Sequence, residues 1–276
     1  MCKDNIKLIL QKFAPNLFSI VDSLIDYNEL CERIKGFLKK NDGKIRPKNF
    51  ISIIINIMLE TSGKTNNDRL YINELVFIDK KIEKALEIIP KEKYKKLGEL
   101  FKSMIFDFSQ LSILNPIGEV LSLLKLNERP NYSFVDYEVN FPNGKSKDFK
   151  FRNNLNGKYE IVEVVNISFD STKYQNQDGL KKYICDKLDY KIKEETRNLD
   201  PNFDKSSLKF LIIIHGLDIE IAKESEAIFR EFKKRKGKIC VNRDYDIFPI
   251  FSIYNDTKLG FTTYDFDEIT NILKPH

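Results

Sequence analysis

The chain has 276 residues, of which 42% are hydrophobic and 32% charged, so it can bury a core and is neither disordered nor fibrous. Its longest apolar stretch, residues 50–59, is interrupted by Ser52 and Asn56 and is shorter than the ~20 residues that a membrane span needs. No apolar signal region follows the first residues. We therefore expect a cytoplasmic protein with no membrane partner.

The cysteines and histidines lack the spacing of a zinc site. They are Cys2, Cys31, Cys185, Cys240, His215 and His276. Scattered cysteines of this kind indicate reduced thiols. Any catalytic metal would have to be held by carboxylates, which favour a hard ion such as Mg²⁺ or Mn²⁺.

The net charge of +5 comes from residues 1–100, which carry 19 basic and 14 acidic side chains, whereas the rest of the chain is balanced. A polyanion would be attracted mainly to this front part and to local basic runs. The densest run is residues 233–238, Lys-Lys-Arg-Lys-Gly-Lys. It predicts either contact with nucleic acid or a solvated helix end, where cations suit the helix dipole.

Apolar residues at helical spacing predict an all-helical domain over residues 1–108. The expected helices cover residues 16–40, 49–60, 70–89 and 92–108. The helix over residues 49–60 is apolar on nearly every side, so we expect it to be buried.

Residues 109–276 form a second predicted domain, in which strands appear. A helix that starts at Pro116 and carries Glu119 comes first. The elements expected after it are strands over 132–141, 147–152 and 159–167, a helix over 177–196, a strand over 209–214, a helix over 219–236, a strand over 247–254 and a short helix over 265–273. Three consecutive strands followed by a helical crossover predict an α/β (α+β) fold with a mixed central sheet flanked by helices.

Two turns bring carboxylates from neighbouring strands together. Asn143-Gly144 favours a tight hairpin, and a second turn over residues 153–157 pairs Asp148 with Glu163. Like charges placed opposite each other destabilise a sheet by about 0.2–1 kcal/mol, and a shared divalent cation would remove that cost. The alternative is that the face carrying Glu163 is exposed to solvent and needs no cation.

A helix with Glu119 leads into the hairpin segment Lys147-Asp148-Phe149, the strand Ile161-Val162-Glu163-Val164-Val165 and a helix that bears lysine and tyrosine. This order, over about residues 110–255, resembles the PD-(D/E)xK nuclease superfamily. The resemblance implies a restriction-endonuclease-like domain in which Asp148 and Glu163 hold one or two magnesium or manganese ions. It further implies that Glu119 reaches the metal directly or through a water, and that the metal polarises the scissile phosphate and activates a water.

The chain departs from the family pattern at Val165, where the motif has a lysine that orients the attacking water. The change indicates either a lysine that has moved or an inactive site. Lys150 lies on the same strand face as Asp148, and Lys187 lies at the inward stripe of the following helix, with Lys191 one turn later. We prefer Lys187 as the catalytic replacement. The alternative for Lys187 is a solvated residue at the rim of the helix.

The polar loop after the third strand, with the start of the next helix, suits contact with a nucleic-acid backbone. The predicted contacts are Lys173, Tyr174, Gln177 and Lys191. The alternative is a loop that is only hydrophilic. His215 ends an apolar strand, where a lone histidine is more often a structural residue with its hydrogen bonds satisfied than a catalytic one.

The function expected from the resemblance is a metal-dependent endonuclease, acting on double-stranded DNA in a bacterial restriction or defence setting. A homodimer would let each of two sites cut one strand. The alternative is an inactive protein with the nuclease fold that binds nucleic acid or a protein partner. A protein-binding scaffold is a third possibility, and it predicts no salt-dependent affinity for nucleic acid.

Overall fold

The computed structural model describes residues 3–40, 49–63, 69–109, 112–168, 176–216, 224–230, 245–255 and 260–272. The chain divides into two compact units, with the main boundary between Val120 and Leu121. We call the part up to Val120 the helical unit and the part from Leu121 the sheet unit. The change of pattern in the sequence predicted this boundary near residue 109. In the structure it falls inside one uninterrupted helix, α7 (Leu114–Asn127), which begins in the helical unit.

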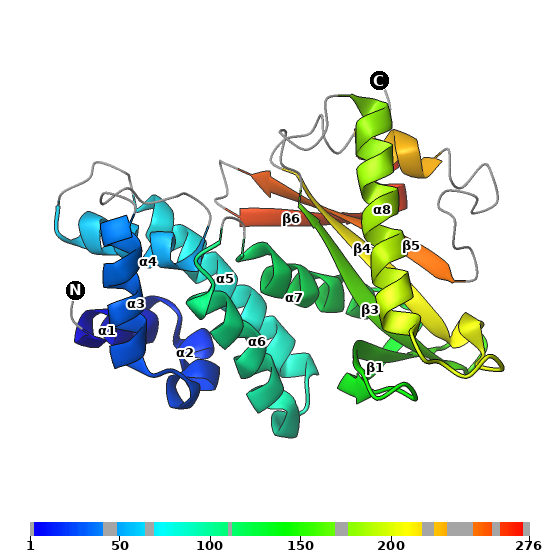
Figure 1. Cartoon of the computed structure of the whole chain (residues 1–276), viewed down its shortest axis with the longest axis horizontal. Coiled ribbons are helices and arrows are strands. Elements are labelled where there is room, and N and C mark those ends of the chain that lie inside the picture. The colour runs from blue at the N-terminus through cyan, green and yellow to red at the C-terminus, as the bar shows by residue number, and fades with distance from the viewer. Residues whose placement is uncertain are drawn as a thin grey trace. The chain divides into compact units, whose positions relative to one another are not determined.

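The helical unit confirms the predicted helical N-terminal region (Figure 1). Its α-helices before α7 are α1 (Lys3–Phe13), α2 (Pro15–Val21), α3 (Tyr27–Lys40), α4 (Phe50–Thr61), α5 (Leu70–Ile88) and α6 (Tyr94–Phe106). The predicted helix over residues 16–40 is interrupted after α2. The reason is Asp26, whose Oδ1 accepts hydrogen bonds from the Asn28 and Glu29 amides at 2.9 and 3.1 Å and so starts α3 as a new helix.

A buried carboxylate joins two helices of this unit. Asp79 on α5 is 5% exposed, and its Oδ1 accepts a hydrogen bond from the Leu17 amide in the first turn of α2 at 2.8 Å. Its Oδ2 accepts from Asn16 Nδ2, also at 2.8 Å. Burial raises the pKa of Asp79 above its ordinary value, and the two hydrogen bonds oppose the increase. Both carboxylate oxygens therefore have a partner, and the side chain ties α5 to α2.

The sheet unit confirms the predicted mixed sheet flanked by helices. The strands lie side by side in chain order and are β1 (Tyr132–Asn140), β2 (Ser146–Asn153), β3 (Tyr159–Ser168), β4 (Leu208–Gly216), β5 (Asp246–Asn255) and β6 (Gly260–Asp265). β1 to β3 form an antiparallel meander, and β3, β4 and β5 are parallel. β6 was not predicted, although its Phe-Thr-Thr-Tyr segment is rich in strand-forming residues.

Helix α8 (Gln177–Thr196) has the bounds that the sequence predicted and packs along β3 and β4 (Figure 1). Its inward stripe consists of Leu180, Ile184, Leu188 and Ile192, all buried. β4 is buried at every position, as expected for a central strand between parallel neighbours. Alternate residues of β3, including Val165 and Ile167, face the same core as α8.

The last described element is the short helix α10 (Phe266–Ile272), close to the prediction. Of the predicted helix over 219–236, residues 224–230 are described and are helical, while the basic run 233–238 lies outside the described residues. Of the four cysteines, Cys31 and Cys185 are described and are free thiols. Among the described helices, none combines the length and the apolar character needed to cross a membrane.

Candidate active site

The predicted register of the second hairpin is confirmed, because Phe149 pairs with Val162 and Lys150 pairs with Ile161. The next step along β2 brings Asp148 to the level of Glu163. There the Asp148 Oδ2 accepts a hydrogen bond from the Val164 amide at 2.6 Å. In a regular hairpin the Val164 amide would donate to a backbone carbonyl of β2. Because it donates to Asp148 instead, the Asp148 carboxylate is held against β3.

Asp148 lies beside a second carboxylate of the sheet unit. One oxygen of Glu138 on β1 and one of Asp148 on β2 lie within 4.8 Å of each other. We call these two residues the acidic group. Glu119, the third acidic residue that the resemblance implied, is a buried residue of α7 in the helical unit.

Glu138 is the member of the acidic group that the sequence analysis missed. In the first hairpin Tyr137 pairs with Phe149 and Val139 with Lys147, so Glu138 lies opposite Asp148. The Asn143-Gly144 turn alone does not predict this pairing, because a two-residue turn would place Val139 opposite Asp148. The hairpin instead closes with the Phe141 amide donating to the Lys145 carbonyl at 2.8 Å, which leaves three residues in the loop and shifts the register by one.

The backbone around Glu138 is irregular. Glu138 has a φ of 53°, in the left-handed region that non-glycine residues rarely adopt, and the β1–β2 register shifts between Phe134 and Asp136. Bulges of this kind redirect side chains and are common beside active sites.

Glu163 has a different environment from the acidic group. It is 4% exposed, so the interpretation that places its face in solvent is wrong. Its Oε1 lies 2.7 Å from the Nζ of Lys191 on α8. Its Oε2 is buried and has no hydrogen-bond partner within the described part of the chain. The charge of Glu163 is therefore balanced by a lysine, and no cation shared with Asp148 is required for that purpose.

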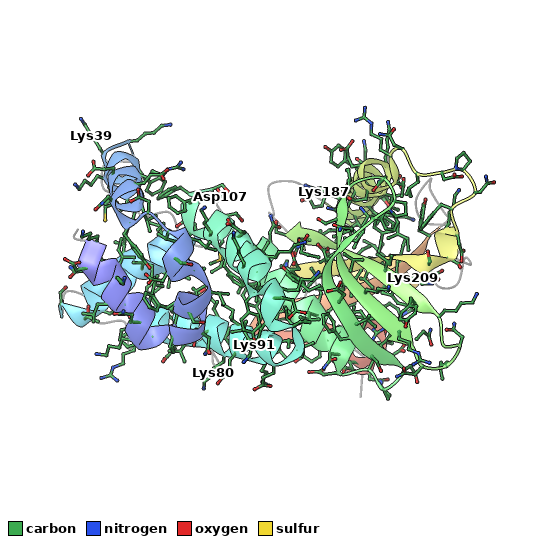
Figure 2. All side chains as sticks on the ribbon, turned by 90° about the horizontal axis from the view of Figure 1, so that it is seen from below. Lys39, Lys80, Lys91, Asp107, Lys187 and Lys209 are labelled. Carbon is green, nitrogen blue, oxygen red and sulfur yellow. The ribbon has the colours of Figure 1, made fainter. Side chains whose placement is uncertain are left out.

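The lysine that meets Glu163 is Lys191 and not Lys187. Lys187 is exposed on the outer side of α8 (Figure 2), as in the rim alternative. Lys150 Nζ lies over the ring of Tyr159, 4.5 Å from its centroid. Burial lowers the pKa of Lys191, but Glu163, Glu195 and Asp148 raise it, and the net pKa lies above its ordinary value. Lys191 is therefore a charged ammonium paired with Glu163.

The other predicted residues have less to do with this site. Lys173 and Tyr174 lie outside the described residues, and Gln177 is the first residue of α8, where Asn176 caps the helix by accepting from the Gly179 amide. His215 is buried, and its Nε2 lies 3.0 Å from Asn166 Oδ1. Burial lowers its pKa to about 3, so it is a neutral structural residue at ordinary pH.

Comparison with known proteins assigns no family to the chain, because no family model, no curated protein and no solved structure matches it. The site therefore has to be interpreted from its chemistry. It offers two carboxylates at the mutual distance of ligands to one cation, and beside them a lysine fixed by a buried glutamate.

Proposed function

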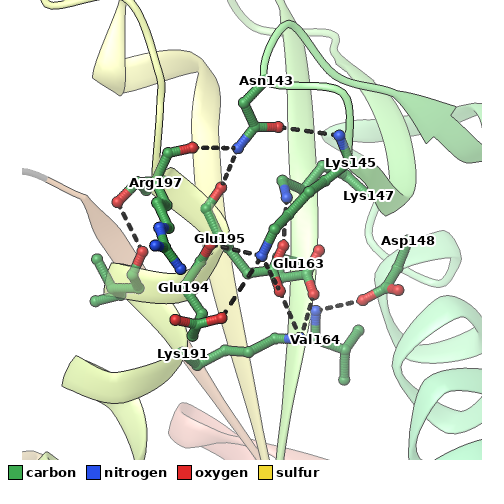
Figure 3. Close-up of polar contacts among 12 residues, drawn as sticks. Asn143, Lys145, Lys147, Asp148, Glu163, Val164, Lys191, Glu194, Glu195 and Arg197 are labelled. Atoms are coloured by element: carbon green, nitrogen blue, oxygen red, sulfur yellow. Dashed lines mark hydrogen bonds and ion pairs between the residues drawn. The ribbon is translucent and has the colours of Figure 1, made fainter.

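We propose that the protein is a divalent-metal-dependent endonuclease that hydrolyses phosphodiester bonds, with double-stranded DNA as its substrate. The observation that carries the proposal is the acidic group beside β3, with the Glu163–Lys191 pair at the adjacent residue of that strand. Figure 3 shows this pair together with Asp148. The element order, with an acidic helix, a three-stranded meander and a helical crossover, supports it through the resemblance to the PD-(D/E)xK nucleases.

The donor set fits a hard cation. Glu138 and Asp148 would hold Mg²⁺ or Mn²⁺, because carboxylate oxygens are the ligands that these ions prefer. The resemblance adds Glu119 as a further ligand. The orphaned Oε2 of Glu163 is a further acceptor with an unmet need for a donor or cation. When bound, the metal would act as a Lewis acid toward the phosphate and lower the pKa of a coordinated water.

The protein side chains have separate tasks in this proposal. Asp148 is kept in place by the Val164 amide, so its carboxylate is oriented before any ligand arrives. Lys191 supplies positive charge toward the phosphate oxygens, where negative charge accumulates in the transition state. Glu163 holds that ammonium in place and keeps it charged. A restriction or defence setting and a homodimer that cuts both strands are part of the same proposal and rest on the resemblance.

A second candidate function is binding of nucleic acid or protein without catalysis. The observation in its favour is that Val165 is buried in the core beneath α8 at the place of the usual motif lysine. This candidate keeps the fold and predicts that nucleic acid is bound but not cut.

Cleavage of supercoiled plasmid and of a short RNA in Mg²⁺, Mn²⁺ or a chelator separates the two candidates. Metal-dependent cleavage that is lost in Lys191→Met and kept in Lys187→Met supports the enzyme, because the control changes an exposed lysine one turn away on the same helix. Salt-dependent binding with no cleavage in any metal favours the second candidate. Cleavage that survives Asp148→Asn would contradict the proposed site.

A further inference from the structure

Lys191 is held by two carboxylates and not by Glu163 alone. Its Nζ lies 2.7 Å from Glu163 Oε1 and 3.2 Å from Glu195 Oε1. Glu195 lies four residues after Lys191 on α8, the spacing at which helical side chains meet. The ammonium is therefore fixed between one glutamate from the sheet and one from its own helix (Figure 3).

Glu195 is in turn fixed by a buried lysine of the first hairpin. Its Oε2 lies 2.5 Å from Lys147 Nζ, and the Lys147 side chain is 0% exposed and lies over the ring of Phe141. Lys145 adds a weaker contact, with its Nζ 3.7 Å from Glu195 Oε1. Glu163, Lys191, Glu195 and Lys147 thus form an ion-pair chain of alternating charge, in which each lysine limits the freedom of a glutamate.

The docking of α8 on the hairpin does not depend on the Glu195 carboxylate. Asn143 Nδ2 donates to the backbone carbonyls of Glu195 and Arg197 at 2.9 and 3.0 Å. Lys145 Nζ donates to the carbonyl of Glu194 at 2.6 Å. Because these bonds use the backbone, removal of the Glu195 charge leaves the end of the helix attached to the hairpin.

We infer that Glu195 is a positioning residue of the proposed active site, and that it holds the Lys191 ammonium beside Glu163 while Lys147 holds Glu195. The inference rests on the proposed function for its effect on catalysis, but the placement of the ammonium can be measured without any activity. A lone Glu163–Lys191 pair would leave a long lysine side chain free to rotate about its one contact. The second carboxylate removes that freedom.

The test compares Glu195→Gln, the conservative Glu195→Asp and the control Glu194→Gln. Glu194 is the preceding residue of α8, and within the described part of the chain its carboxylate forms a long ion pair with Lys145, at 4.0 Å. The first readout is the NMR signal of the Lys191 ammonium, assigned with Lys191→Arg. We expect the signal to be broadened by faster exchange in Glu195→Gln and to be unchanged in Glu194→Gln.

The second readout is single-turnover cleavage of DNA at saturation. Glu195→Gln should lower the rate by about 10²-fold, as expected when a catalytic group is displaced by ~1 Å, with no change in the Kd for DNA. Glu195→Asp should restore part of the rate, because a carboxylate is again present between the two lysines. Thermal unfolding of all three variants identifies any that is misfolded.

Failure of this inference and failure of the proposed function give different results. An unchanged Lys191 ammonium signal in folded Glu195→Gln would overturn the inference whatever the cleavage rate. No metal-dependent cleavage by the unmodified protein would overturn the proposed function, and the ammonium signal would still decide whether Glu195 positions Lys191.

Discussion

Both units bury carboxylates, and two of these, Asp79 and Glu163, are used differently. Asp79 of the helical unit has a neutral donor on each oxygen, the Leu17 amide and the Asn16 side chain. Glu163 of the sheet unit has a lysine on one oxygen and no hydrogen-bond partner for the other among the described residues. A buried polar group that serves only the fold is normally satisfied, as Asp79 is.

Burial of Asp79 serves the fold, whereas burial of Glu163 leaves one of its oxygens available for chemistry. The hydrogen bonds of Asp79 bridge two helices and leave its oxygens nothing more to bind. Glu163 lies at the end of an ion-pair chain and next to the residue whose amide binds Asp148. We therefore expect substitution of Asp79 to change stability and substitution around Glu163 to change activity.

The largest expected effect is on cleavage by Asp148→Asn. The amide oxygen can still accept from the Val164 amide, so the fold is kept, but one anionic ligand of the acidic group is lost. We expect the single-turnover rate to fall by about 10²–10³-fold, the size seen when one stabilising group is removed from a transition state. The matched variant Asp79→Asn should cleave at the unmodified rate. A comparable loss of rate in Asp79→Asn would contradict the view that Asp79 serves the fold alone.

Binding of Mg²⁺ should stabilise the protein through the acidic group. A ligand that binds only the folded state contributes about 2.7 kcal/mol at a concentration 100 times its Kd. We expect Mg²⁺ to raise the Tm of the unmodified protein and of Asp79→Asn, and to have little effect on Glu138→Gln. A full increase in Tm in Glu138→Gln would place the cation elsewhere.

Asp79→Ala should affect stability and not chemistry. It leaves the buried Leu17 amide without an acceptor, and such a loss costs about 1–3 kcal/mol. Urea unfolding would measure the change, with Asp107→Ala as an exposed carboxylate control in the same unit. Unchanged stability in Asp79→Ala would contradict the structural role of the Asp79 hydrogen bonds, on which its contrast with Glu163 depends.

The smallest expected effect concerns His215, a buried titratable group of the sheet unit whose Nε2 lies 3.0 Å from Asn166 Oδ1. Its pKa is lowered to about 3, below the ordinary 6.5, so the unfolded chain binds a proton that the folded protein does not. Stability is then fully present above pH 6.5 and is lost as the pH falls toward 3. Between pH 6.5 and 5.5 the loss should be about 1 kcal/mol. His215→Gln should unfold in urea with a smaller dependence on pH over this range, and an equal dependence would contradict the buried neutral form.

Much of the sheet unit was predictable because local patterns set it. Alternating residues and tight turns gave the meander and the β2–β3 register, and the stripe from Leu180 to Ile192 gave α8 at its observed bounds. The start of α3 at Tyr27 was missed because it depends on the turn that Asp26 caps, a local hydrogen bond that apolar spacing does not reveal.

The site was predictable only in part. The level of Asp148 and Glu163 on neighbouring strands follows from the second turn, whereas Glu119 was expected only from the resemblance. Glu138 was missed because its place opposite Asp148 depends on a three-residue loop in the first hairpin, and a tight Asn143-Gly144 turn would have placed Val139 there. The choice between Lys187 and Lys191 could not, because both lie near the edge of the apolar stripe of α8. Which one turns inward is decided by Glu163 and Glu195, whose contacts with Lys191 are set by the packing of α8 on the sheet.

A crystal of the protein grown or soaked with Mn²⁺ would test the central claim most directly, because anomalous scattering locates the ion without reference to activity. The account predicts a manganese peak beside the carboxylate oxygens of Glu138 and Asp148, and no such peak in a crystal of Asp148→Asn. Those two carboxylates turned apart with no peak between them, or a peak that Asp148→Asn retains, would contradict it.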